Sequence, residues 1–297
     1  MRIVTRPDFD GVVCAVLLYD AEEITEPIFW VEPNDVQQGR VEIRSGDIVA
    51  NLPYHENCTL WFDHHYTNRI RKPFDGAFRE APSAARIIYD YYRSRLQSDY
   101  QRLVDAADKI DSADLTREEV THPEKFDDVL LSMTITNLEE SEEPYWNHLV
   151  AVLSKKTISE AMEDAEIRTR CEAVIEENRI YKDLLLKHTQ EHGAVAVTDF
   201  RPLEKVPGGN RFLVYSLFPA CVVHMRIRFD ARDRSRIVVN VGHSIFNPGC
   251  RVNVGLLLAR FGGGGHPGAG SCRFPAERAD EYLPQIRAAL IRNEPLE

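Results

Sequence analysis

The 297-residue sequence lacks the features that would place it in several specialised classes of protein. Its six cysteines are widely spaced and form no C-x-x-C pair, which excludes a zinc knuckle and a small disulfide scaffold. No apolar run reaches the ~18 residues of a membrane span, and the opening residues, MRIVTRPDFD, contain no apolar signal core. We therefore expect a cytoplasmic protein that does not contact the membrane.

The composition is that of a globular protein, and the length is sufficient for two domains. Charge is distributed unevenly: residues 1–193 carry 38 acidic and 22 basic residues, whereas residues 194–297 carry 9 acidic and 14 basic residues. Thirteen of those 14 basic residues are arginine. An acidic half suits cation binding and an arginine-rich half suits phosphate binding, because the guanidinium group matches phosphate oxygens. Glu-rich helix surfaces in one half are the simpler explanation.

The first half of the chain has the pattern of an α/β fold. Brief apolar runs bounded by Gly, Pro and Asn predict buried strands of a mostly parallel sheet at 2–5, 28–31, 47–50 and 59–62. Helices are predicted at 12–19, 84–95, 99–110 and 127–136. Residues 157–190 contain no Gly or Pro and predict one long helix that ends at His192–Gly193.

The remaining residues predict a smaller α/β lobe with a mixed sheet. Apolar β-type runs lie at 194–197, 211–218, 221–229 and 237–241. A helix to Arg260, a glycine run, a short strand and a final helix follow. The sequence therefore predicts two lobes joined by a long helix.

Two acidic motifs come directly after predicted strands. Asp8 and Asp10 follow the first strand, at the edge where open α/β sheets bind ligands, and two such carboxylates can converge on Mn²⁺ or Mg²⁺. A solvated turn in which Asp10 caps a helix is the alternative. The triplet Asp63-His64-His65 follows another strand at the same level. A carboxylate can fix the tautomer of a metal-bound histidine and leave the second imidazole for substrate, and this triplet favours a functional site.

Two further patterns carry chemistry. Aspartates at 105, 108 and 111 would lie along one side of a helix near its C-terminus, where a cation would offset the unfavourable helix dipole; a solvated acidic face is the alternative. The run Gly262–Gly265 followed by His266 lies between a helix and a strand. Bare glycine amides allow close approach of phosphate oxygens, so this run predicts a backbone phosphate cradle rather than a flexible loop.

The order D-x-D, D-H-H, a downstream aspartate and a distant GGGH-x-x-A-G resembles the DHH phosphoesterase superfamily over nearly the whole chain. This superfamily includes RecJ-type exonucleases, oligoribonuclease/pAp phosphatases, cyclic-dinucleotide phosphodiesterases and manganese-dependent pyrophosphatases and exopolyphosphatases. The resemblance implies a metal-binding DHH domain at 1–155, a connecting long helix at 156–193 and a DHH-associated substrate-binding domain at 194–297.

The same resemblance implies roles for individual residues. One or two Mn²⁺ or Mg²⁺ ions would be held by Asp8, Asp10, Asn51, His64 and Asp108, with Asp111 as the alternative to Asp108. His65 would face the substrate, supported by Asp63. Substrate phosphate would be held by Gly263, Gly264, Gly265, His266 and Arg251, although this arginine lies three places later than in relatives.

The implied activity is metal-dependent hydrolysis of a phosphoester or phosphoanhydride in a nucleotide, a short single-stranded oligonucleotide or a related small phosphate compound. Arg6 and Val4 occupy places where relatives carry a histidine, and Asn51 replaces an aspartate. These departures predict weak or single-metal occupancy and slow turnover. A non-hydrolytic nucleotide or phosphate sensor and a single-strand nucleic-acid binder using the arginines at 226–236 are the alternatives. An exposed long helix is also compatible with a homodimer.

Overall fold

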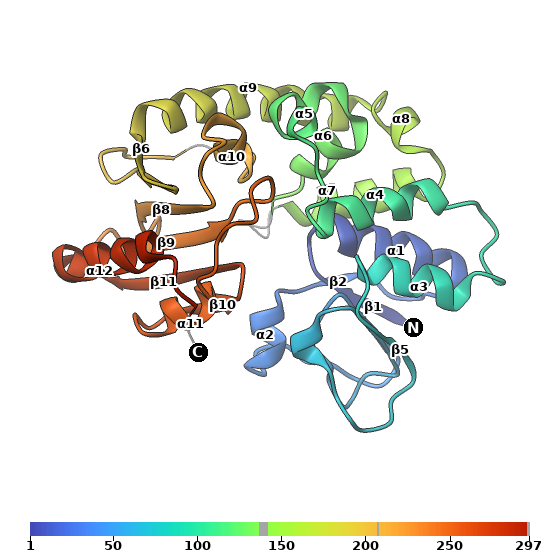
Figure 1. Cartoon of the computed structure of the whole chain (residues 1–297). Helices are drawn as coiled ribbons and strands as arrows, with labels where there is room; N and C mark the ends of the chain where they lie inside the picture. The colour runs from blue at the N-terminus through green and yellow to red at the C-terminus, as the bar shows by residue number, and fades with distance from the viewer. Residues whose placement is uncertain (137–141, 207, 296–297) are drawn as a thin grey trace. The chain divides into compact units, whose positions relative to one another are not determined.

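The computed structural model describes residues 1–136, 142–206 and 208–295 (Figure 1). The chain divides into two compact units, and each is described by itself. Unit 1 comprises residues 1–115 and 123–172, and unit 2 comprises residues 116–122 and 173–297. The division falls inside helix α9 (Ala165–His188). In the described part of the chain, no helix is both long and apolar enough to cross a membrane.

Unit 1 is built on a parallel sheet of five strands in the order β2-β1-β3-β4-β5. The strands are β1 (Arg2–Thr5), β2 (Phe29–Trp30), β3 (Asp47–Ala50), β4 (Leu60–Asp63) and β5 (Gly76–Phe78). Its helices are α1 (Phe9–Ala21), α2 (Pro33–Gln37), α3 (Ala84–Tyr92), α4 (Gln101–Asp111), α6 (Asp127–Met133), α7 (Glu143–Leu153) and α8 (Ile158–Ala161). Strands β1, β3 and β4 are short apolar segments buried along most of their length, which is why each appears in the sequence as a brief apolar run.

Helix α1 begins at a sharp turn after β1, and Gly11 is required there. A Cβ atom at this position would lie 1.9 Å from the carbonyl oxygen of Arg6. The rest of α1 is almost entirely buried, from Phe9 to Leu18. The first strand and α1 are therefore held close together, which places the residues between them at the carboxyl edge of the sheet.

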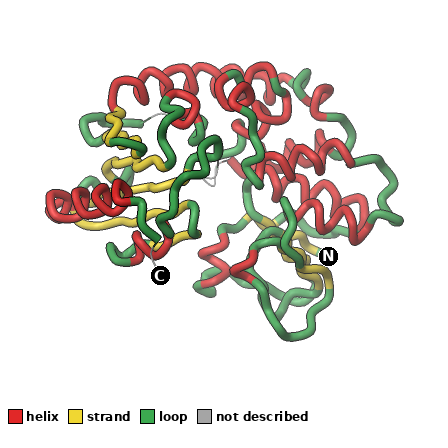
Figure 2. Tube along the Cα trace, in the orientation of Figure 1, coloured by secondary structure: helices red, strands yellow, loops and turns green. Residues whose placement is uncertain are grey.

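Unit 2 contains a mixed sheet of six strands in the order β10-β11-β9-β8-β7-β6. Strands are drawn in yellow in Figure 2. The strands are β6 (Thr189–His192), β7 (Val195–Asp199), β8 (Val223–Phe229), β9 (Arg236–His243), β10 (Gly264–His266) and β11 (Ala269–Pro275). Among the described strands of this sheet, only β7 and β8 pair in parallel. Its other helices are α5 (Arg117–Thr121), α10 (Leu213–Leu217), α11 (Val254–Ala259) and α12 (Ala279–Arg292). The α/β class, the parallel first sheet and the mixed second sheet agree with the sequence prediction.

Two predicted elements were wrong. The helix predicted over 157–190 is divided into α8 and α9, because the Asp164 carboxylate accepts the amides of Glu166 and Ile167 and so begins a new helix. It also ends early, since residues 189–192 form β6 and Gly193 takes a left-handed φ of 63° in the turn before β7. The strand predicted at 211–218 is helix α10, which follows an Asn210 side chain that accepts the amide of Phe212.

Candidate metal centre

The candidate site lies in unit 1, where three neighbouring parallel strands reach their carboxyl ends. Asp8 follows β1, Asn51 follows β3, and Asp63 with the two histidines ends β4. Because parallel strands end at one edge of the sheet, these side chains meet. The Asn51 amide donates a 3.0 Å hydrogen bond to Asp8 Oδ1. The backbone of Asn51 is left-handed, with φ of 57°, a conformation that asparagine and aspartate tolerate best after glycine.

The two aspartates of the D-x-D motif have different roles. Asp8, not Asp10, is the N-cap of α1, and its carboxylate accepts the Gly11 amide at 2.8 Å. Asp10 lies in the first turn of α1 and is buried. The alternative of a solvated turn capped by Asp10 is therefore wrong.

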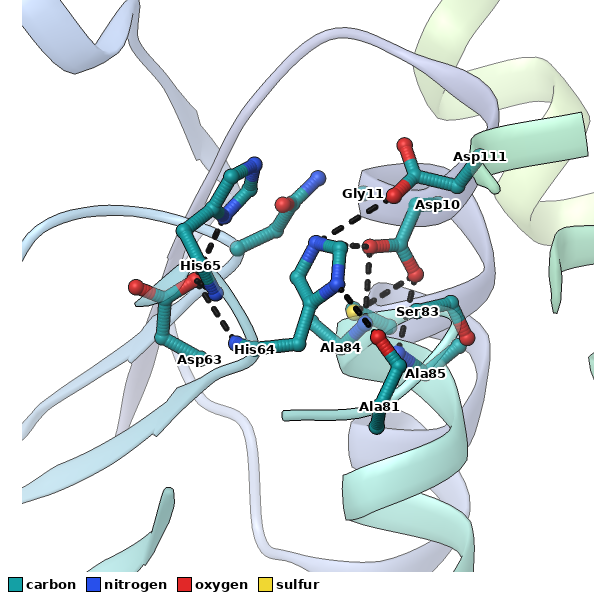
Figure 3. A network of polar contacts seen from close by, with 12 residues as sticks. Asp10, Gly11, Asp63, His64, His65, Ala81, Ser83, Ala84, Ala85 and Asp111 are labelled. Atoms are coloured by element: carbon teal, nitrogen blue, oxygen red, sulfur yellow. Dashed lines mark hydrogen bonds and ion pairs between the residues drawn. The ribbon is translucent and has the colours of Figure 1, made fainter. Parts of the chain in front are cut away.

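Asp10 is bound by the N-terminus of α3. Its two carboxylate oxygens accept the backbone amides of Ala84 and Ala85 at 2.9 and 2.8 Å (Figure 3). The positive end of the helix dipole and these amides favour the charged carboxylate. Burial nevertheless raises the pKa of Asp10 well above its usual range, and the nearby carboxylates of Asp111 and Asp8 raise it further. The site therefore concentrates negative charge where a cation would neutralise it.

His64 is oriented as a metal ligand. Its Nδ1 lies 2.9 Å from the carbonyl oxygen of Ala81 and donates to it, which turns Nε2 toward the carboxylates of Asp10 and Asp111. Nε2 is buried, makes no hydrogen bond with any described residue, and lies 3.2 Å from Asp111 and 3.9 Å from Asp10. Figure 3 shows the imidazole directed at both carboxylates.

A cation between Nε2 of His64 and these two carboxylates would neutralise the negative charge that they concentrate there. The ligand atoms of Asp10, His64 and Asp111 all lie within 4.8 Å of one another. Two carboxylate oxygens and one imidazole nitrogen suit Mn²⁺, and Mg²⁺ less well. The residues present therefore fit a divalent metal ion.

His65 is held for a different purpose. Asp63 is fully buried, and its Oδ1 lies 2.8 Å from Nδ1 of His65, which leaves Nε2 of that ring for another group. The same carboxylate accepts the amide of His64 at 2.9 Å and the side-chain amide of Asn68 at 2.7 Å. Burial lowers the pKa of His65, but the Asp63 hydrogen bond and charge outweigh it, so the net pKa is raised. Asp63 thus contacts both histidines, the ring of His65 and the backbone of His64.

Asp108 does not join the cluster, and Asp111 does. Asp108 accepts hydrogen bonds from the Ser83 hydroxyl at 2.6 Å and from Nε of Arg86 at 2.7 Å. Asp111 is the last residue of α4 and lies beside His64. The expected convergence of Asp108 on the metal position is therefore wrong by one helical turn, because only the C-terminal end of α4 reaches the carboxyl edge of the sheet. Asp108 instead ties α4 to Ser83, the N-cap of α3.

Comparison with solved structures now identifies the family. The pGpG-specific phosphodiesterase PggH from Vibrio cholerae is 32% identical to this chain, with a TM-score of 0.83 over 99% of both chains. The chain belongs to the DHH phosphoesterase superfamily. The DHH domain of a member of a ribosomal-protein family (TM-score 0.66, 99% and 87% coverage) and the exonuclease RecJ bound to manganese (0.55, 98% and 90%) are each 12% identical and share the fold. No protein-family model and no curated protein sequence matches the chain.

Arg6 and Asn51, the two residues that depart from the DHH pattern, both contact Asp8. Nη1 of Arg6 lies 3.3 Å from Asp8, and Nε of Arg6 lies 3.6 Å from Glu32. Burial raises the pKa of Asp8 to about 6, although the charge of Arg6 opposes the shift. Oδ1 of Asn51 is buried without a hydrogen-bond partner. The part of the site around Asp8 therefore has less negative charge than it would have with an aspartate at position 51.

The residues that the DHH resemblance assigns to phosphate lie in unit 2. Gly264, Gly265 and His266 form β10, which pairs with β11, so the glycine run is partly a strand. A Cβ atom on Gly263 or Gly265 would lie 2.2 or 2.3 Å from a carbonyl oxygen of β11, which explains these glycines by close backbone approach. The exposed Arg251 donates its backbone amide to Asn293. Phosphate binding by these residues, with His266 facing His65, stays a prediction.

Proposed function

We propose that this protein is a metal-dependent phosphodiesterase that hydrolyses a dinucleotide or a short oligonucleotide, with pGpG as the first candidate substrate. The observation that carries this proposal is the convergence of the buried Nε2 of His64 on the carboxylates of Asp10 and Asp111. The substrate class is supported by the 32% identical pGpG-specific phosphodiesterase.

Asp10, His64 and Asp111 would hold the metal ion, which we propose to be Mn²⁺ or Mg²⁺. Such an ion lowers the pKa of a bound water and polarises a phosphoryl oxygen. The protein's own residues prepare the site: the α3 amides orient Asp10, and the Ala81 carbonyl fixes the tautomer of His64. His65, whose ring is held by Asp63, would direct its Nε2 to the phosphoryl oxygens of the substrate.

We further propose that one ion binds more tightly than a second. A second ion near Asp8 would meet the guanidinium of Arg6 and the uncharged amide of Asn51. Both reduce the electrostatic attraction on that side of the site.

A turnover screen with Mn²⁺ tests the proposal. We expect release of mononucleotides from pGpG, and less or no reaction with pAp, cyclic dinucleotides, pyrophosphate and polyphosphate. His64→Ala should abolish both turnover and Mn²⁺ binding. The matched control is His148→Ala, since His148 also pairs with an aspartate in unit 1 but lies outside the cluster.

A non-hydrolytic sensor is the second candidate, and the Arg6–Asp8 ion pair favours it because it fills space beside the metal cluster with a fixed positive charge. Tight pGpG binding together with Mn²⁺ binding and no turnover of any substrate in the screen would support the sensor over the phosphodiesterase.

A further inference from the structure

An exposed aromatic side chain follows directly after the DHH triplet. Tyr66 is 65% exposed, which is the highest value among the large hydrophobic side chains of the described residues. Among the described residues, no aromatic ring packs against the Tyr66 ring and no cationic side chain lies over it. An aromatic ring this exposed buries little apolar surface, so core packing does not explain it.

The turn that carries Tyr66 is held rigidly beside His65. Tyr66–Asn68 is a single 3₁₀ turn in which the Asn68 amide donates to the carbonyl oxygen of His65 at 2.9 Å. The side chain of Asn68 donates to Asp63, the same buried carboxylate that binds the His65 ring. One anchor therefore fixes both the imidazole and the turn that presents the tyrosine.

Arg69 follows this turn directly as its C-cap. Its amide donates to the carbonyl oxygen of Tyr66 at 3.3 Å, which joins the two residues at their backbones. Arg69 is exposed and makes no ion pair within the described residues. Residues 64–72 contain three basic residues and no acidic one, although the surrounding half of the chain is strongly acidic.

We propose that Tyr66 and Arg69 form a nucleobase-binding subsite beside the metal centre. The Tyr66 ring would stack on a base next to the scissile phosphate, since aromatic side chains stack on any base. The guanidinium of Arg69 offers paired donors, which match the O6 and N7 acceptors of guanine. This inference rests on the proposed function and specifies its substrate as a guanine-containing dinucleotide.

The test compares substrates with and without a base. The full-length protein with Mn²⁺ is assayed on pGpG and on its two singly abasic analogues, which keep the same phosphodiester. Tyr66→Ala should lower kcat/KM for pGpG by about 5- to 100-fold through KM, because one base–aromatic stack is lost. Turnover of the abasic analogue that lacks the stacked base should be unchanged within twofold, and Tyr66→Phe should behave like the wild type.

The matched control is Tyr19→Ala, since Tyr19 is 41% exposed in the last turn of α1, at the opposite end of that helix from Asp8 and Asp10. Arg69→Gln should reduce the preference for pGpG over pApA about tenfold. Calorimetric binding of pGpG in EDTA provides a readout that needs no turnover, and Tyr66→Ala should weaken it similarly. If the wild type binds pGpG without hydrolysing it, the proposed function fails and this titration still decides the subsite. Equal pGpG affinity for Tyr66→Ala and wild type would overturn the inference.

Discussion

Replacing Asn51 by aspartate would place an additional carboxylate against Asp8. The present contact is a 3.0 Å hydrogen bond from the Asn51 amide to Asp8 Oδ1. Two unit charges about 4 Å apart repel by about 4 kcal/mol at the effective dielectric constant of a protein surface. Position 51 accepts aspartate sterically, because both residues tolerate its left-handed backbone.

Proton uptake limits the cost of that repulsion in the metal-free protein. The pKa of Asp8 is about 6 already, so protonating it at pH 7 costs only about 1.4 kcal/mol. The protonated carboxyl would also restore the hydrogen bond that the amide made. We therefore expect the free energy of unfolding of Asn51→Asp to lie about 1–2 kcal/mol below that of the wild type at pH 7.

The sign of the pH dependence follows from the same argument. A carboxyl group whose pKa is raised in the folded state contributes stability that is lost as pH rises through that pKa. The deficit of Asn51→Asp should therefore be small at pH 6 and about 1.4 kcal/mol larger at pH 8 than at pH 7. Urea unfolding in EDTA at these three pH values measures it.

Added Mn²⁺ should reverse the effect. The extra carboxylate raises the attraction for the ion, and we expect the affinity to increase about tenfold or more, with release of a proton on binding. Calorimetric titration in two buffers of different ionisation enthalpy measures affinity, stoichiometry and proton release. The control is Gln101→Glu, which places a carboxylate beside Asp105, whose Oδ1 now accepts the Gln101 side-chain amide at 2.6 Å, and which lies outside both groups that could hold a metal ion. It should destabilise the fold without any gain in Mn²⁺ affinity. Equal Mn²⁺ affinity and stoichiometry for Asn51→Asp and the wild type would refute the reasoning.

Three further outcomes follow from the structure. Asp111→Asn should weaken Mn²⁺ binding at least about tenfold, as measured by calorimetry. Asp108→Asn should keep the Mn²⁺ stoichiometry and lower the free energy of unfolding by about 1–3 kcal/mol, as measured in urea. The reverse pattern would contradict the assignment of Asp111 to the metal. Burial lowers the pKa of His224 to about 3, so the folded state keeps this imidazole neutral. Its contribution to the free energy of unfolding should fall by about 1.4 kcal/mol per pH unit below about 6.5, and the stability difference between wild type and His224→Gln should change by about 2 kcal/mol between pH 7 and pH 5. Gly11→Ala should cost about 3 kcal/mol or more, measured by urea unfolding, because its Cβ would lie 1.9 Å from the carbonyl oxygen of Arg6.

The sequence by itself determined the class of the fold and the edge at which the site lies. Short apolar runs end three residues before Asp8 and immediately before Asn51 and Asp63, and parallel strands bring such ends together. The order of the motifs was sufficient to predict the family. These features depend on residues that are close in the sequence, so local patterns reveal them.

The tertiary structure decided everything that depends on contacts between distant segments. Whether Asp108 or Asp111 joins His64 is set by how far α4 extends toward the sheet, and a three-residue repeat of aspartates is the same in both cases. The binding of Asp10 by the amides of α3 joins residues more than 70 positions apart. The residue at which α9 ends could not be predicted from the sequence either, because residues 189–192 form a strand through pairing with β7. Helix propensity is a weak local preference, and pairing with a distant strand overrides it.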